Sequence, residues 1–564
     1  MRSRKWRLGG AGVCLAWASV ASAQEPAPAQ ELLRQQARER ALREQMEATP
    51  DVRLEAAPGD SRERLPADEA PCFLIRHIVL TGAFAERYAA ALAAADPPDD
   101  PATGRCLGTA GINLVMKRVQ NALVSRGLVT TRVLAAPQDL REGTLQLTLV
   151  AGTLGALRLA DGTASRATTW NALPIRPGTV LNLRDIEQGL ENLQRIPTVS
   201  ADIQIVPAQG PTAQPGQSDL LVSWQQRRAW RASLSLDDSG SRATGRLQAG
   251  ATLSLDAPLR LNDLAYINYG RSVFDGSGKG TRSWTAHYDL PFGRWLAGAT
   301  ASAYDYRQSV AGAYETYVYS GDSRNAELRL SRLLFRNATR KFGVYGRGWW
   351  RQTRNYIDDS EIQLQRRRSA GWELGLTHRQ FFGKATLDAS VAYRRGTGAF
   401  GALPAPEQAH GEGTSRLGVV TADAQLQLPW QWGRQALRYV AAWRAQWNRT
   451  ALVPQDRFAI GGRYSVRGFD GELSLSGERG WLLRNELGVA LGAGQEFYLG
   501  ADYGHIGGRA AQWQRGDHLA GAVLGLRGGA AGLNWDFFVG SPLHKPRGFP
   551  TAYTTTGFSL AASF

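Results

Sequence analysis

The chain has 564 residues, a formal net charge of +16 and a mean hydropathy of −0.31. It is too long for one ordinary domain. Beyond the N-terminus no run of ~20 apolar residues occurs, which excludes a membrane-spanning helix there. The basic residues are scattered among alternating positions, so nucleic acid is not expected as a partner. Glycine, at 63 residues, and Trp, Tyr and Phe, at 17 each, are abundant, as in the turns and aromatic girdles of transmembrane β-barrels.

The first 23 residues have the features of a secretory signal peptide. Four basic residues within positions 1–7 precede an apolar run from Leu8 to Val20, and Ala21-Ser22-Ala23 fits the small-residue cleavage pattern. The apolar run is too short to span a bilayer of ~30 Å as a helix. We therefore expect residues 1–23 to be a signal peptide that directs the chain out of the cytoplasm.

A polar helix is predicted at Gln30–Glu47, within an N-terminal segment of residues 24–49. The stretch is rich in Leu, Ala, Arg, Gln and Glu, which favour helices. Its apolar residues are too few to bury a face in a core. It is therefore either a solvated tail or a helix in a polar environment such as a water-filled lumen. Residues 50–71, which contain Pro58, Gly59 and Pro66, are predicted to be a linker.

Two small α/β units are predicted to follow, at residues 72–152 and 153–227. The helical and strand patterns lie at 85–95, 112–125, 129–134 and 144–150 in the first unit, and at 186–196, 199–206 and 219–224 in the second. Units of this size have little room for a core. In an oxidising compartment a disulfide between Cys72 and Cys106 is expected, and two buried free thiols are the alternative.

Residues 228–564 are predicted to form a transmembrane β-barrel. Apolar and polar residues alternate over many short segments separated by polar turns, which is the pattern of barrel strands. Examples are Trp230–Leu236, Leu247–Leu255 and Trp284–Leu290. At ~20 residues per strand and connection, we predict a mainly β fold with roughly a 16-stranded antiparallel transmembrane β-barrel. A barrel of this size encloses a water-filled lumen that needs a plug.

The sequence contains no recognisable catalytic or metal-binding pattern. The seven His residues do not pair as HxxxH or HExxH or with Cys, and no GxSxG or phosphate-binding loop occurs. We therefore expect neither an enzyme nor a cofactor. One segment stands out, because Arg457–Gly471 places several glycines around Arg467 and glycine permits close backbone approach. By itself this segment is better interpreted as a plain surface loop.

Together these features resemble the outer-membrane transporters of two-partner secretion, the haemolysin or filamentous-haemagglutinin secretion/activation type of the POTRA-plus-barrel group. Val466-Arg467-Gly468-Phe469 matches the group's VRG(F/Y) motif, and the run from Tyr498 through Gly500 to Asp502 resembles its partner motif on a barrel strand. The resemblance implies a loop folded back into the lumen, with Arg467 paired to Asp502.

The same resemblance extends to the N-terminal half of the chain. It implies that residues 72–152 and 153–227 are POTRA domains, that Cys72 and Cys106 are bridged, and that the helix within 24–49 plugs the lumen. The fold expected is a barrel preceded by two POTRA domains and an N-terminal helix.

The last segment alternates up to Phe564, with Phe558, Leu560 and Ala562 on the same face. A terminal aromatic in such a strand resembles the sorting signal of bacterial outer-membrane barrels. The resemblance implies a monomer in the outer membrane, with its POTRA domains in the periplasm, lipid around the barrel and the barrel-assembly machinery as a partner during biogenesis.

The expected client is a large, partly unfolded exoprotein of adhesin or haemolysin type with an N-terminal secretion domain. One alternative is an assembly or insertion factor for outer-membrane proteins, which usually carries more POTRA domains and no plug helix. Another is a porin-like channel for small solutes, which has no need of periplasmic repeats.

Overall fold

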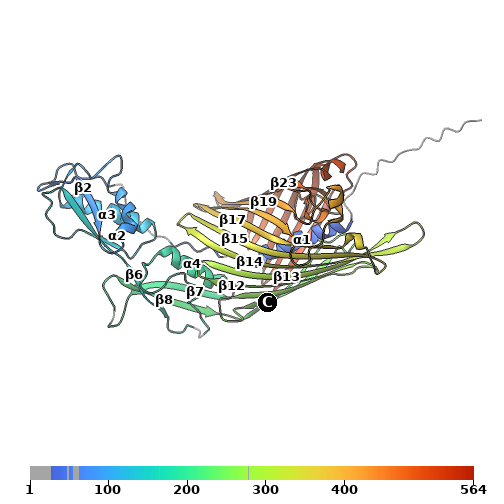
Figure 1. The fold of residues 1–564 in the computed structure, drawn as a ribbon, viewed down its shortest axis with the longest axis horizontal. Helices are drawn as coiled ribbons and strands as arrows, with labels where there is room; N and C mark the ends of the chain where they lie inside the picture. The colour runs from blue at the N-terminus through green and yellow to red at the C-terminus, as the bar shows by residue number, and fades with distance from the viewer. Residues whose placement is uncertain (1–26, 48–49, 55–62, 164–165, 212, 277) are drawn as a thin grey trace, which may run out of the picture.

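The computed structural model describes residues 27–47, 50–54, 63–163, 166–211, 213–276 and 278–564. The predicted signal peptide, residues 1–23, lies outside this described part. The molecule is elongated, with one small domain at its far end, a second beside the barrel, and the barrel itself (Figure 1). Within the described ranges, no helix combines the length and the apolar character needed to cross a membrane.

A closed antiparallel β-barrel forms the C-terminal half, as predicted. In the described part of the chain sixteen strands close it, with β27 paired to β9. The strands are β9 (Trp230–Asp237), β10 (Gln248–Asp256), β11 (Leu264–Ser272), β12 (Gly280–Phe292), β13 (Trp295–Ala311), β14 (Thr316–Arg336), β15 (Arg340–Ile357), β17 (Arg367–Phe382), β18 (Ala385–Thr397), β19 (Gly418–Trp432), β20 (Gln435–Asn448), β23 (Arg479–Gly492), β24 (Gln495–Gly507), β25 (His518–Ala530), β26 (Leu533–His544) and β27 (Thr555–Ser563). The short β16 (Ser360–Glu361) extends the β15 hairpin.

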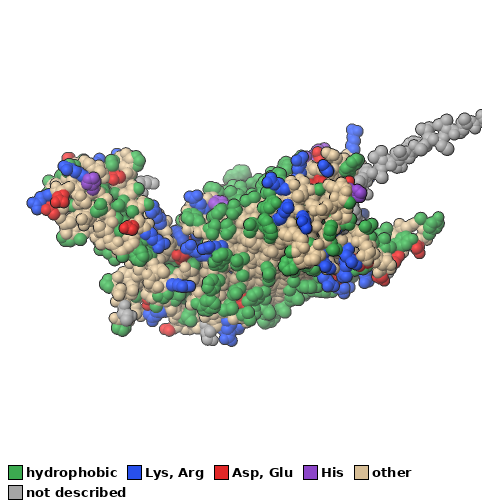
Figure 2. Space-filling view, viewed as in Figure 1, with side chains coloured by type: hydrophobic (Ala, Val, Ile, Leu, Met, Phe, Trp, Pro, Cys, Tyr) green, Lys and Arg blue, Asp and Glu red, His purple; other side chains and the backbone are tan. Residues whose placement is uncertain are grey.

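Side chains of the barrel strands alternate between lipid and lumen. In β24, Leu499 and Tyr503 are 53% and 38% exposed on the outside, whereas Asp502 is 3% exposed and faces inward. Hydrophobic side chains cover the middle of the barrel wall, and Lys and Arg gather nearer its ends (Figure 2). An apolar outer band bounded by polar rims is what a barrel embedded in lipid requires.

The first small domain packs helices against a sheet in the order β2–β5–β4. Its elements are β1 (Phe73–Leu74), β2 (His77–Thr81), α2 (Ala85–Tyr88), η1 (Ala89–Ala94), β3 (Cys106–Leu107), α3 (Thr109–Ser125), β4 (Arg132–Leu134) and β5 (Thr144–Val150). Val115 and Val119 of α3 pack on Leu145 and Leu147 of β5 in the core. A disulfide joins Cys72 to Cys106, with the two Cα atoms 5.3 Å apart.

Two element bounds in the first domain differ from the prediction. The expected helix at 85–95 divides into α2 and η1. The expected strand at 129–134 is reduced to β4, because the side chain of Gln120 binds the carbonyl of Thr131 and the N–H of Val133 at 2.7 and 2.9 Å. These side-chain hydrogen bonds replace ladder hydrogen bonds that a longer strand would need.

The second small domain has a sheet in the order β6–β8–β7, covered by α4. Its elements are β6 (Thr153–Leu159), α4 (Leu183–Gln194), β7 (Val199–Pro207) and β8 (Gln217–Gln226). This domain sits against the turns that join β10 to β11 and β12 to β13; for example, Asn171 Nδ2 donates to the carbonyl of Leu261 at 2.6 Å. If the small domains lie in the periplasm, as the family resemblance implies, the barrel end that carries these turns is the periplasmic end and the opposite end is extracellular.

The N-terminal helix α1 (Ala27–Met46) lies inside the barrel (Figure 1). Its polar character therefore matches its surroundings, since a lumen lined with polar side chains offers hydrogen bonds on every face of the helix.

Candidate functional site in the barrel lumen

Residues 449–478, between β20 and β23, fold back into the lumen and carry the candidate site. A small hairpin of β21 (Phe458–Ile460) and β22 (Leu475–Gly477) forms the stem of this loop. Val466 and Phe469, on either side of the loop tip, are fully and almost fully buried in a cluster with residues of β23, β24 and β25. The apolar anchors therefore hold the intervening Arg467 at a defined place against the barrel wall.

Arg467 binds two acidic side chains of the wall. Its Nε donates to Asp502 Oδ2 at 2.8 Å and its Nη2 to Asp502 Oδ1 at 2.9 Å, a bidentate pair. Its Nη1 donates to Glu486 Oε2 at 2.6 Å, and its Nη2 also reaches the carbonyl of Asn485 at 3.2 Å. The backbone N–H of Arg467 donates to Asp502 as well, at 2.9 Å. Charge-assisted bidentate pairs of this kind are among the stronger protein hydrogen bonds.

Glycines create the space that this arrangement occupies. A Cβ on Gly500 would lie 2.5 Å from Arg467 Nη2 and 2.9 Å from Val523 Cγ1. A Cβ on Gly521 would lie 1.9 Å from the carbonyl oxygen of Arg467. Gly468 has φ of +94°, in the region that glycine adopts without strain. The tip of the loop therefore approaches the wall at backbone distance.

The structure thus brings together the residues singled out in the sequence: Val466, Arg467, Gly468 and Phe469 on the loop, and Gly500 and Asp502 on β24. Phe564 lies elsewhere, directly after β27, where its backbone N–H donates to the carbonyl of Ala232 in β9 at 2.8 Å. Cys72 and Cys106 lie in the first small domain.

Glu486 is a site residue that sequence reasoning did not assign. It lies on β23, beside β24, and accepts from both Arg467 and Arg527, the latter at 2.6 Å. Alternation along β23 places Glu486 on the lumen face with Arg484. That alternation is the signal that could have identified it, although the pairing of β23 with β24 had to be known as well.

The helix α1 is bound to the lumen wall by polar contacts along its length. The wall contacts join Glu31 to the hydroxyls of Tyr304 and Thr244, Arg43 to Glu327, and Glu47 to the hydroxyl of Tyr266. Arg34 also links α1 to the candidate loop, since its Nη2 donates to the carbonyl of Gly471 at 2.7 Å. These contacts of the plug are hydrogen bonds and ion pairs, which water can replace.

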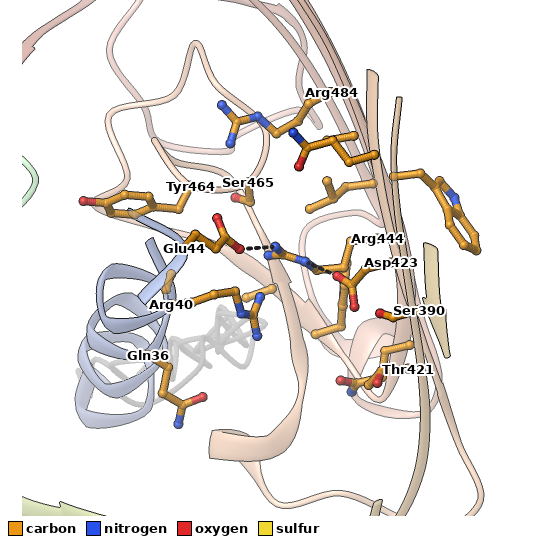
Figure 3. A pocket seen from close by; sticks show the side chains of 18 of the residues that line it. Gln36, Arg40, Glu44, Ser390, Thr421, Asp423, Arg444, Tyr464, Ser465 and Arg484 are labelled. Atoms are coloured by element: carbon orange, nitrogen blue, oxygen red, sulfur yellow. Dashed lines mark hydrogen bonds and ion pairs between the residues drawn. The ribbon is translucent and has the colours of Figure 1, made fainter. Parts of the chain in front are cut away.

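A water-accessible cavity of about 1260 Å³ remains between α1, the loop and the wall. Figure 3 shows Arg40 and Glu44 of α1 facing Arg444 and Asp423 of the wall across this space. Arg444 Nε donates to Asp423 Oδ1 at 2.9 Å, and Arg444 Nη2 lies 4.0 Å from Glu44 Oε1. Of the cavity-lining side chains within the described residues, eighteen are Arg or Lys and ten are Asp or Glu. The side chains that line the cavity therefore carry an excess of positive charge.

A cluster at the periplasmic end ties the second small domain, the linker and the barrel together. Arg336, at the end of β14, is buried and donates to Glu187 at 2.9 Å and to Glu191 at 2.8 and 3.0 Å, both acids on α4. The same two carboxylates accept the backbone N–H groups of Leu54 and Val52, at 2.9 and 3.0 Å. The segment that follows α1 is therefore held by the contacts that dock the second domain.

Comparison with known proteins agrees with this architecture. Residues 216–528 match the profile of the family described as haemolysin secretion/activation protein ShlB/FhaC/HecB. Residues 73–152 match the ShlB-type POTRA domain, and residues 153–207 match a POTRA domain. The two small domains are therefore POTRA domains.

Similar whole proteins cover almost the full chain. The outer membrane transporter CdiB-2 of Burkholderia pseudomallei strain 1026b is 36% identical over 551 residues, covering 94% of this chain and 93% of the relative. The haemolysin transporter ShlB of Serratia marcescens is 23% identical, covering 71% of each chain. The solved structure of CdiB from Acinetobacter baumannii has a TM-score of 0.84 and 31% identity, covering 96% of this chain and 100% of that one.

A closed barrel with a plugged lumen, preceded by periplasmic POTRA domains, defines an outer-membrane transporter of the POTRA-plus-barrel type. The chain belongs to the haemolysin secretion/activation protein family, whose members serve two-partner secretion.

Proposed function

We propose that this protein recognises a partly unfolded partner exoprotein in the periplasm and secretes it through the barrel lumen. The observation that carries the proposal is that two segments, α1 and the Arg467 loop, occupy the lumen, and that α1 is held there by polar contacts that can be exchanged for water. The client carries an N-terminal secretion domain and is of adhesin or haemolysin type; the name of the relative from Serratia marcescens, a haemolysin transporter, is in line with the haemolysin type.

Recognition of the client is assigned to the POTRA domains. In the described part of the chain β7 pairs with β8 on one side and with no strand on the other. An extended client segment can add to such an edge through backbone hydrogen bonds. The free edge of β7 is the longest regular one in either POTRA sheet, at nine residues.

Passage then requires α1 to leave the lumen and the loop that carries Arg467 to move. Breaking the contacts of Arg467 with Asp502 and Glu486 is the step that frees the loop. No ATP is available in the periplasm, so folding of the client outside the cell draws transport forward. In this proposal the chain acts as a monomeric transporter, not as an enzyme. Phe564 serves as its sorting signal to the barrel-assembly machinery, and the domains divide at residues 23, 49, 71, 152 and 227.

Deletion of the gene tests the proposal. The exoprotein is expected to disappear from the medium and to accumulate or be degraded in the periplasm, while other outer-membrane barrels keep their normal amounts. Continued appearance of the exoprotein outside the cell contradicts the transporter function. A general loss of outer-membrane barrels would favour the alternative function, assembly or insertion of outer-membrane proteins.

A further inference from the structure

A groove on the extracellular rim of the barrel is lined by Arg449, Arg479 and Arg509, which we call the arginine groove. It forms where the loops after β20 and β24 meet the first residue of β23, and it has a volume of about 580 Å³. The three arginines are exposed. The groove shares no lining residue with the lumen cavity, although Arg449 and Glu478 are the first and last residues of the loop that carries Arg467.

The cations of the arginine groove are unpaired. Over the ranges that the structure describes, the side chains of Arg449, Arg479 and Arg509 make no hydrogen bond or ion pair with the protein. The acid among the described lining residues is Glu478, which is 3% exposed and accepts the backbone N–H of Ala510 at 3.1 Å. The three arginines therefore line one groove without forming an ion pair within the described residues, and their N–H donors are available to a ligand.

Backbone packing directs Arg479 along the rim. A Cβ on Gly507 would lie 3.1 Å from Arg479 Nε, so the side chain of Arg479 lies across the neighbouring strand β24. The loop that carries Arg509 begins directly after that strand. The absence of a side chain at Gly507 thus leaves room for the side chain of Arg479 to lie across β24.

The groove lies just beyond an aromatic belt on the lipid-facing side. Trp447, Trp481 and Tyr503 are 47%, 38% and 38% exposed on the outer face of β20, β23 and β24. Arg449 and Arg479 lie two residues from Trp447 and Trp481, on the same face and about 7 Å nearer the extracellular end. Exposed Trp and Tyr mark the membrane–water interface in barrels. The guanidinium groups therefore lie at the level of the lipid headgroups of the outer leaflet.

We propose that the arginine groove binds the phosphate groups of lipopolysaccharide, the phosphorylated glycolipid of the outer leaflet. The planar guanidinium group matches phosphate oxygens with paired N–H donors and remains charged at any physiological pH. Three unpaired guanidinium groups at one headgroup position suit the closely spaced phosphates of this lipid. The proposal depends on the location of the barrel in the outer membrane and is independent of the secretion function.

The test compares two sets of charge-removing substitutions in the full-length protein in detergent. The test variant is Arg449→Gln, Arg479→Gln and Arg509→Gln combined. The matched control combines Arg340→Gln, Lys384→Gln and Arg434→Gln, which remove the same charge from exposed positions in the periplasmic turns. The probes are lipopolysaccharide, the same lipid with its phosphates removed, and inorganic phosphate, and binding is measured by titration and by lipid adducts in native mass spectrometry.

We expect the test variant to bind lipopolysaccharide about tenfold more weakly or worse, and the control to bind it like the wild type. The wild type should bind the dephosphorylated lipid as weakly as the test variant binds the intact lipid. The proposal is overturned if the test variant binds lipopolysaccharide as tightly as the wild type does. It is also overturned if the wild type binds the dephosphorylated lipid as tightly as the intact lipid. Saturation of the groove by inorganic phosphate at the affinity of the lipid also overturns it, because the groove would then be a site for free anions.

A folding control keeps the result interpretable. A folded barrel resists unfolding in detergent at room temperature and shifts in gel mobility on heating, which checks each variant. If the triple variant fails this check, Arg479→Gln alone is used, with a severalfold loss of affinity expected. Replacement of all three arginines by Lys is expected to retain part of the affinity, since the charge remains but the bidentate geometry is lost. Secretion of the client is a separate readout, so failure of this proposal leaves the transport function standing.

Discussion

At the residue scale, the loop is held to the barrel wall by one cation between two acids. Replacement of Arg467 by Ala leaves Asp502 and Glu486 without their shared counter-ion, and removing one partner of a buried ion pair costs about 3–5 kcal/mol. We expect Arg467→Ala and Asp502→Ala each to reduce the amount of exoprotein in the medium relative to that in the periplasm. Combined charge reversal, Arg467→Asp with Asp502→Arg, should partly restore it.

The matched control for these substitutions is Arg547→Ala, at an exposed position on an extracellular loop, which should secrete like the wild type. Normal secretion by either single variant at wild-type barrel levels would show that the pair has no role in transport.

A second prediction at this scale concerns Gly500. Any Cβ at this position would collide with Arg467 and Val523 at 2.5 and 2.9 Å. Gly500→Ala should therefore displace the guanidinium group and impair secretion in the same direction as Arg467→Ala, although both charges remain. Gly348→Ala is the control, because a Cβ on Gly348 of β15 meets nothing within 4 Å. Immunoblots of the medium measure both variants, and equal secretion by the two would contradict the steric argument.

At the scale of elements, the cluster around Arg336 couples the position of the linker to the docking of POTRA domain 2 on the barrel. Arg336→Met leaves Glu187 and Glu191 of α4 buried with fewer donors, and we expect the linker to loosen. Faster hydrogen exchange of the Val52 and Leu54 amides is the measurement, since these N–H groups donate to the two carboxylates. Adding Glu187→Gln and Glu191→Gln should restore part of the protection because it removes the uncompensated charge.

Arg340→Gln, at an exposed position in the same turn, should leave exchange of both amides unchanged. Unchanged protection in Arg336→Met would show that the linker is held independently of this cluster.

Elements differ in how far the sequence alone predicts them. The barrel strands were predictable because alternation is a property of side chains, and so was the polar helix α1. Glu486 was not assigned because its partner depends on which strands pair and in which register. The docking of Val52 and Leu54 could not be predicted from the sequence either, because it uses their backbone N–H groups, which every residue except proline has. The pairing of Arg467 with Asp502 was expected only through the family resemblance.

At the scale of the whole molecule, the barrel combines a wall suited to lipid with a lumen suited to water and polar polypeptide. The contacts described above between the polar helix α1 and the wall are hydrogen bonds and ion pairs, which water can replace when α1 leaves the lumen. The apolar anchors Val466 and Phe469 lie in a hydrophobic cluster with the wall. Moving the loop would expose these side chains to water and therefore costs more free energy than moving α1. We infer that α1 leaves first and the loop follows.

The charge of the lumen gives a prediction for the unplugged barrel. Deletion of residues 27–46 removes α1 and should raise ionic conductance in planar bilayers. Because basic side chains outnumber acidic ones around the cavity, eighteen to ten within the described residues, the open pore should prefer anions. The preference should weaken as salt rises, since the Debye length falls from about 30 Å at 0.01 M to about 3 Å at 1 M. The reversal potential in a KCl gradient measures this anion preference.

Arg444→Glu in the same deletion background should shift the reversal potential toward cation selectivity, because Arg444 faces the cavity beside Asp423. A cation-selective current from the deletion variant would contradict this prediction, because it would show that the excess of basic residues around the cavity does not set the ion selectivity of the pore.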